Sequence, residues 1–237
     1  MRVLAVGAHP DDLEILCAGT LARYRQAGHE VVMAHACNGD CGHFIIPPAE
    51  LAAMRDAEAK AAAAIIEAEV LTLPDMGDGD IMANDPKARM GMVDIIRKAR
   101  PDVIITHAPE DYMPDHVAVT ELVFFASFFA SVPHWKTEQD TPHHDKVPPI
   151  YYMDTLASVG FMPEEYVDIT DTLDIKAKML ECHESQLTWM REHDKIDMVE
   201  FVTAMARARG LQSGVRYAEG FRRLRTWPRV TTERLLP

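Results

Sequence analysis

The chain has 237 residues, enough to bury a sizeable hydrophobic core without disulfide bonds, and we expect one domain spanning residues 1–237. Its 24 lysines and arginines stand against 37 aspartates and glutamates, a net charge of −13, which argues against nucleic acid or an anionic membrane surface as a partner. Four scattered cysteines and the lack of an export segment predict a cytoplasmic protein without a disulfide framework.

In the first half of the chain, short apolar runs alternate with amphipathic or alanine-rich segments. We expect strands at 2–8, 29–36, 70–74 and 101–108, and helices at 13–24, 49–67 and 87–99. Gly28 is a plausible end for the first helix. This alternation predicts right-handed βαβ units. The expected fold class is therefore α/β: a Rossmann-like, doubly wound, mostly parallel sheet with helices on both faces.

The second half is less regular. Residues 116–131 are almost wholly apolar but too few to cross a bilayer, which needs about 20 residues, so we expect a buried helix. Its four phenylalanines leave a subunit interface as the alternative. A polar loop at 133–149 precedes an expected strand at 149–156. Further helices are expected at 172–183 and 195–209.

Two of the expected strands end in turns that carry titratable groups instead of ordinary turn residues. The first strand ends in His9-Pro10-Asp11-Asp12, and the strand at 101–108 leads into the segment 107–116. In a doubly wound sheet of order 3-2-1-4-5, the first and fourth strands are neighbours, and ligands bind beyond their carboxyl ends. We therefore expect one crevice to contain six side chains from these two turns: His9, Asp11, Asp12, Asp111, Asp115 and His116.

Such a cluster needs a cation or unusual pKa values, because neighbouring carboxylates repel one another. Two histidines and one carboxylate with open coordination positions suit catalytic Zn²⁺ or Fe²⁺. Adjacent aspartates point in different directions, so one can bind the ion while the other reaches a water molecule. An isolated pair of aspartates is more often a helix cap, and a nucleotide site is disfavoured because the turn is acidic and lacks a glycine-rich fingerprint.

Several motifs, in order and spacing, resemble the LmbE/PIG-L family of metal-dependent N-deacetylases. They are "AHPDDLEILCAGTLARYRQAGHEV", "NGD", "MRDAEAKAAA", "PDVIITHAPEDYMPDH", "KMLECHESQ" and "YAEGFR". Members of that family remove the acetyl group from N-acetylglucosamine-type sugars or their conjugates.

The resemblance implies a role for each matching residue. The ligands of the metal, Zn²⁺ or another divalent ion such as Fe²⁺, would be His9, Asp12 and His116. Asp11 would be the general base, and Asp115 a supporting carboxylate of the catalytic site. Substrate contacts would come from Arg55 and from Asp78, with Asp75 as the alternative to Asp78. For His183 we expect a structural hydrogen bond.

One position departs from the family pattern. Many members have a histidine where this chain has Met113, and that histidine is thought to stabilise the oxyanion or protonate the leaving amine. A thioether does neither. Either the metal polarises the carbonyl alone while Asp11 passes its proton to the amine, or another side chain substitutes; His43 and His107 are the candidates.

The expected function is hydrolysis of an N-acetyl group by a water molecule that the metal activates and Asp11 deprotonates. The substrate would be a small acetylated amino sugar or conjugate. The alternatives are metal-dependent hydrolysis of another amide, an ester or a phosphoester, and a non-catalytic ligand-binding protein of the same fold. Relatives often form trimers or hexamers, so we also expect a homo-oligomer.

Overall fold

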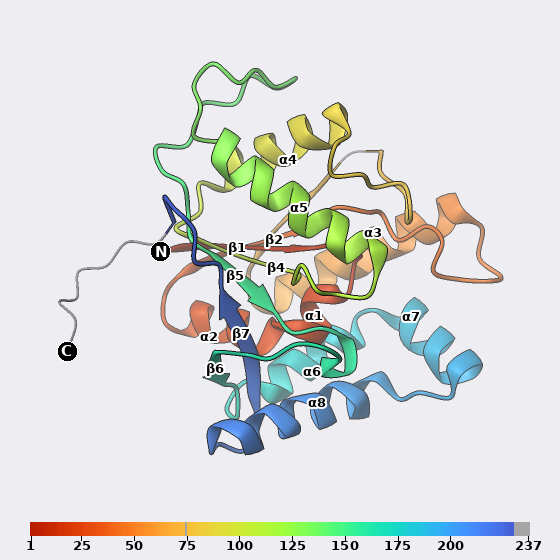
Figure 1. The fold of residues 1–237 in the computed structure, drawn as a ribbon. Coiled ribbons are helices and arrows are strands. Elements are labelled where there is room, and N and C mark those ends of the chain that lie inside the picture. The colour runs from red at the N-terminus through yellow and green to blue at the C-terminus, as the bar shows by residue number, and fades with distance from the viewer. Residues whose placement is uncertain (74, 230–237) are drawn as a thin grey trace, which may run out of the picture.

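A mostly parallel sheet forms the centre of the computed structural model, which describes residues 1–73 and 75–229 (Figure 1). Its strand order is β3-β2-β1-β4-β5-β7-β6. The strands are β1 (Arg2–Gly7), β2 (Glu30–His35), β3 (Glu69–Thr72), β4 (Val103–Thr106), β5 (Ile150–Met153), β6 (Glu165–Asp168) and β7 (Ala218–Arg223). The first five strands pair in parallel in the expected order, which confirms the fold class. The expected strand at 70–74 corresponds to β3, and Pro74 lies outside the described residues.

Helices cover both faces of the sheet. They are α1 (Asp12–Leu16), α2 (Ala18–Gln26), α3 (Pro48–Ile65), α4 (Pro86–Ala99), α5 (Pro114–Phe129), α6 (Leu173–Glu181), α7 (Glu184–Trp189) and α8 (Met198–Ser213). A 3-10 turn at Leu156–Ser158 follows β5, and a π-helical turn at Met190–Asp194 follows α7. Within the described residues, no helix is both long and apolar enough to cross a membrane.

The side chains of alternating residues in the central strands pack into two separate hydrophobic cores, one on each face of the sheet. Leu4 and Val6 of β1 belong to the core under α4 and α5, whereas Val3 and Ala5 belong to the core under α1, α2, α3, α6 and α8. Figure 1 shows these two sets of helices on opposite faces of the sheet. Because both faces of β1 are buried, its sequence is continuously apolar. The strand that leads into the His9 turn is therefore packed on both sides.

Three expectations about elements were wrong or incomplete. The helix expected at 13–24 is two helices, broken at Cys17, whose φ of −145° is not helical. Strands β6 and β7, which join the sheet antiparallel, were not expected, nor was α7. The helix expected to be buried at 116–131 is α5, and only one face of it is buried, because Phe124 and Phe128 are 44% and 39% exposed.

The break at Cys17 has its cause in β7. Glu219 of β7 is buried, and its carboxylate accepts hydrogen bonds from the backbone N–H groups of Gly19 and Thr20 at the start of α2. Lys176 of α6 lies 2.6 Å from the same carboxylate and donates a 2.7 Å hydrogen bond to the carbonyl of Ile15 in α1. This buried ion pair joins β7 and α6 to the helix that follows the His9 turn.

Replacing Lys176 with methionine is expected to lower the free energy of unfolding by about 3–5 kcal/mol, because Glu219 is then left buried without a cation. Chemical denaturation measures the change. Lys178→Met is the matched control, because Lys178 is exposed on the same helix. Equal stability of the two variants would contradict this role of the ion pair.

Candidate metal centre and active site

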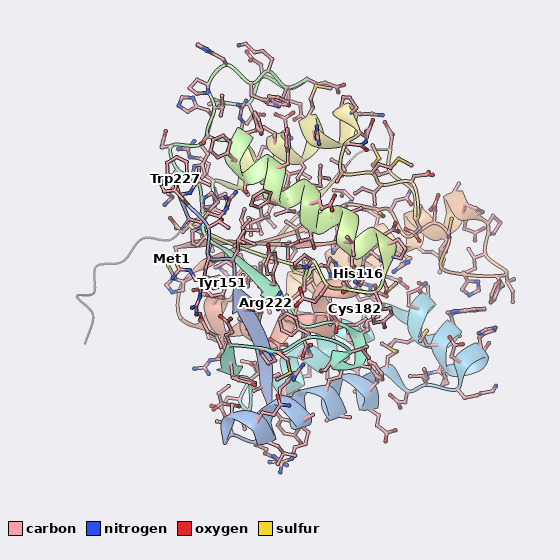
Figure 2. All side chains as sticks on the ribbon, viewed as in Figure 1. Met1, His116, Tyr151, Cys182, Arg222 and Trp227 are labelled. Atoms are coloured by element: carbon pink, nitrogen blue, oxygen red, sulfur yellow. The ribbon has the colours of Figure 1, made fainter. Side chains whose placement is uncertain are left out.

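The turns after β1 and β4 lie side by side because these strands pair in parallel, with Val3 opposite Val103. His9 and Asp11 lie in the turn after β1, and Asp12 begins α1. His116 lies in the first turn of α5, which begins at Pro114 beyond β4. Figure 2 shows His116 at the opposite end of the sheet from Met1, consistent with a site at the carboxyl ends of the strands.

The three residues expected to bind the metal converge. Asp12 Oδ1 lies 3.2 Å from Nε2 of His116, and Asp12 Oδ2 lies 3.5 Å from Nδ1 of His9. Ligand atoms that are each about 2.1 Å from a tetrahedral ion lie roughly 3.4 Å from one another. His9, Asp12 and His116 each offer a ligand atom within 4.8 Å of the others.

Each of the two histidines has a carboxylate on its other ring nitrogen. His9 Nε2 lies 3.0 Å from Asp115 Oδ2, and His116 Nδ1 lies 2.9 Å from Asp111 Oδ2. A carboxylate behind a ligating histidine fixes the tautomer and orients the ring towards a metal. Asp111 and Asp115 therefore leave His9 Nδ1 and His116 Nε2 as the nitrogens that can face an ion.

The charge of the cluster fits a bound cation. Burial disfavours protonation of His9, but hydrogen bonds to Asp115 and Asp12 outweigh it and raise its pKa to about 10. Burial also opposes charge on His116, yet Asp12 and Asp111 raise its pKa to about 9. His116 Nε2 is buried and has no hydrogen-bond partner among the described residues. A divalent ion can take the place of the proton on such a buried imidazole nitrogen, and the negative charge of the site favours it.

Asp11 has the strained backbone and buried carboxylate expected of a reactive group. Its φ of 124° lies in the left-handed region, which is costly for a residue with a Cβ and is found mainly at functional sites. Arg55 of α3 lies 3.1 Å from Asp11 Oδ1 and also donates to the carbonyls of Pro10 and Gly39. Burial raises the pKa of Asp11, while the Arg55 guanidinium acts in the opposite direction.

Arg55 and Asp78 join loops that would otherwise be independent. Arg55 is only 3% exposed, although it lines the cavity described below. Asp78 accepts hydrogen bonds from the backbone N–H groups of Gly39 and Cys41, at 2.9 and 3.2 Å. Asp75, the alternative to Asp78, lies away from the site and forms a 2.9 Å ion pair with Lys87.

Neither histidine considered as a substitute for the one missing at Met113 lines the cavity. His107 is fully buried, stacks on His116 with ring centroids 3.7 Å apart, and its Nε2 accepts a hydrogen bond from the N–H of Ala8. His43 Nδ1 accepts from the backbone of its own loop. Met113 itself faces the cavity, so its wall carries a thioether at that point.

The cavity has a volume of about 350 Å³, at the lower end of the usual range for small-ligand sites. His9, Asp11 and Asp12 contribute charged groups to its lining. Most of its apolar lining comes from the second half of the chain: Leu156, Leu180, Leu187, Met190 and Met198. We refer to these five residues as the apolar wall. The site therefore combines a charged reactive end with a surface suited to an apolar group.

Two residues of the site had no assigned role in the sequence. Asp111 was expected in the crevice without a specific role. Its contact with Nδ1 of His116 indicates that it orients this ring. Glu14 is fully buried, and its carboxylate lies 3.5 Å from Nε2 of His183. The signal for Glu14 was present in the opening motif, since a glutamate is out of place on the buried face of a helix. His183 lines the cavity with Glu14 as its polar neighbour, and the structural hydrogen bond expected for it stays a prediction.

The PIG-L family model, described as GlcNAc-PI de-N-acetylase, matches residues 4–127. Diacetylchitobiose deacetylase of Thermococcus kodakarensis is 29% identical over 231 residues, covering 93% of this chain and 82% of that protein. The structure of N,N'-diacetylchitobiose deacetylase from Pyrococcus horikoshii matches with a TM-score of 0.80 and 26% identity, over 94% of this chain and 83% of that one.

A second solved structure is equally similar in fold. It is the 4-carboxy-2-hydroxymuconate hydratase from Pseudomonas putida, with a TM-score of 0.80, 25% identity, and coverage of 99% of this chain and all of that one. The same fold thus occurs in proteins named for deacetylation and for hydration.

Proposed function

Since the matched region makes up more than half of its length, the chain belongs to the PIG-L family, and we propose that it is a metal-dependent N-deacetylase. Its substrate is an N-acetylglucosamine-type sugar or conjugate. The single observation that carries the proposal is the convergence of His9, Asp12 and His116 beside the strained, buried Asp11. The names of the deacetylase relatives supply the substrate class.

In this proposal, His9, Asp12 and His116 hold the metal, with Zn²⁺ as the ion and Fe²⁺ as an alternative. When bound, the metal polarises the amide carbonyl and makes water easier to deprotonate. Asp11 takes the proton of the attacking water on its carboxylate. Arg55, 3.1 Å away, keeps that carboxylate in place. Asp115 orients His9 through the hydrogen bond to Nε2.

We also propose the broader setting. The chain forms one domain over residues 1–237, because β1 near its start and β7 near its end belong to one sheet. Its cysteines, all four free, fit the reducing cytoplasm. A homo-oligomer, a trimer or a hexamer, would cover the exposed rings of Phe124 and Phe128 on α5.

The test is release of free amine from acetylated amino sugars by the metal-replete protein, compared with other acylated amines, esters and phosphoesters. We expect amine release from the acetylated sugars and its loss after chelation, with recovery when Zn²⁺ is added. Release of phosphate alone, or turnover only of unrelated amides, would contradict the proposed substrate. Ligand binding without any turnover would favour the non-catalytic alternative.

The apolar wall supports a conjugate over the free sugar. Burial of one methylene is worth about 0.8 kcal/mol, or about fourfold in kcat/KM. For a series of alkyl glycosides of N-acetylglucosamine, we expect kcat/KM to rise with chain length by up to this factor per methylene. Leu187→Asn should flatten the series, whereas Leu211→Asn, at a position 67% exposed on α8, should not. A flat series for the unmodified protein would contradict this preference.

A second candidate function is hydration of an unsaturated carboxylic acid. Met113 favours it, because addition of water to a double bond releases no amine that needs a proton from that position. The likeness to the hydratase covers nearly the whole chain. Loss of the ultraviolet absorbance of 4-carboxy-2-hydroxymuconate, without amine release from any acetylated sugar, would select this function over the first.

A further inference from the structure

His183 is a buried histidine that the proposed mechanism does not yet use. It lies between α6 and α7, is fully buried, and lines the same cavity as Asp11. Neither of its ring nitrogens has a hydrogen-bond partner among the described residues. A buried polar group without a partner is costly, and such exceptions in folded proteins call for an explanation.

Glu14 stands directly beside this ring. It is fully buried in α1, two residues after Asp12, and its Oε2 lies 3.5 Å from His183 Nε2. Neither carboxylate oxygen of Glu14 forms a hydrogen bond within the described part of the chain. A neutral His183 ring with its proton on Nε2 can face Glu14 as a donor, but only the doubly protonated ring forms a buried ion pair with it and also carries a proton on Nδ1.

The surroundings favour the protonated ring. Burial disfavours charge on His183, but Glu14 and then Asp11 outweigh it, so its pKa is raised, while Arg55 acts in the opposite direction. His35 is the other buried histidine near Glu14, and burial lowers its pKa to about 4, so it stays neutral. The negative charge of Glu14 is thus available to His183.

Amide hydrolysis needs a proton donor for the leaving nitrogen, and the cavity offers few. Met113 has no proton to give. Both oxygens of Asp78 are held by backbone N–H groups of the neighbouring loop. Burial and the adjacent Asp40 raise the pKa of the Cys41 thiol, which makes it a poor acid. Apart from the proposed metal ligands, and from Asp11, which takes up the proton of water, His183 is the remaining lining residue with a suitable acidic proton.

We propose that His183, held by Glu14, is the general acid that protonates the leaving amine in place of the histidine missing at Met113. This inference rests on the proposed deacetylation. Water adds to the carbonyl carbon as Asp11 removes a proton. The C–N bond then breaks, its electron pair stays on nitrogen, and nitrogen takes the proton of His183 Nδ1. Acetic acid and the amine leave, the acid gives up its proton to solvent, and the proton held by Asp11 returns to His183.

The test compares two leaving groups in one protein. An amino sugar needs a proton to leave, whereas the 4-nitrophenolate of 4-nitrophenyl acetate does not. In His183→Gln, we expect the ratio of amide to ester turnover to fall by about 10²–10⁴. His193→Gln, which removes an exposed histidine of the following π-helical turn, should keep the ratio of the unmodified protein. Ester hydrolysis by Asp11→Asn measures the background that does not depend on the active site. After this background is subtracted, the ester turnover of His183→Gln shows whether its active site is intact.

Glu14→Gln provides a second variant with a separate readout. Loss of the carboxylate lowers the pKa of His183, so the alkaline limb of the kcat profile for the amide should move to lower pH. An unchanged amide-to-ester ratio in His183→Gln, equal loss of both activities, or an unmoved alkaline limb in Glu14→Gln would each overturn the inference. Absence of amine release by the unmodified, metal-replete protein would instead refute the proposed function.

Discussion

Asp11→Asn is expected to lower kcat for amide hydrolysis by about 10²–10⁴ while leaving the metal content unchanged. The amide of asparagine has nearly the shape of the carboxylate but cannot accept the proton of water. Arg55 can still contact the remaining oxygen, at the position now 3.1 Å from its guanidinium. Turnover is measured as free amine released, and metal content by elemental analysis of the same samples.

The matched control for this variant is Asp75→Asn. Asp75 also has a positive φ, 57°, but it is exposed and pairs with Lys87 away from the cavity. It should retain full activity. Loss of metal in Asp11→Asn would indicate that Asp11 is a metal ligand and not the base. Full activity of this variant would contradict any catalytic role of Asp11.

The second large effect is expected for the metal ligands. His116→Ala should lose bound metal and activity together, because it removes the buried Nε2 that lies 3.2 Å from Asp12 Oδ1. Asp111→Asn should weaken metal affinity by about 10–100-fold, the usual effect of removing a carboxylate behind a ligating histidine. Titration with Zn²⁺, followed by a competing chelator, measures both affinities.

His134→Ala serves as the control for nonspecific loss of a histidine, since His134 is exposed in the loop after α5. It should bind metal as the unmodified protein does. Normal metal occupancy in His116→Ala would contradict the ligand assignment. A normal affinity in Asp111→Asn would mean that the 2.9 Å contact with His116 does not orient the ring.

The order of the five parallel strands could be predicted because it follows from local patterns. Continuous apolar runs such as 2–8 indicate strands buried on both faces, and the helices between them allow few topologies. From that order alone, the turns bearing His9 and His116 were expected to meet, and the structure brings them together. The assignment of roles to these residues remains a prediction.

The sequence could not predict contacts that depend on distant parts of the chain. The break at Cys17 depends on Glu219, some 200 residues later, which caps α2. Neither β6 nor β7 has a continuous apolar pattern, because no residue of β6 is fully buried and the buried residues of β7 include Glu219 and Gly220. In the sequence, nothing distinguishes Arg55 from a solvent-exposed residue of an alanine-rich helix. Its contact with Asp11 arises only in the folded chain.

By itself, then, the sequence determined the central sheet and the types of residue at its carboxyl edge, because both depend on short-range patterns of polarity and on spacing. Tertiary structure alone decided which nitrogen of each histidine is free, that Asp75 lies outside the site, and that Glu14 stands beside His183. The physical reason is that hydrogen bonds and burial act over a few ångströms in space, whatever the separation along the chain.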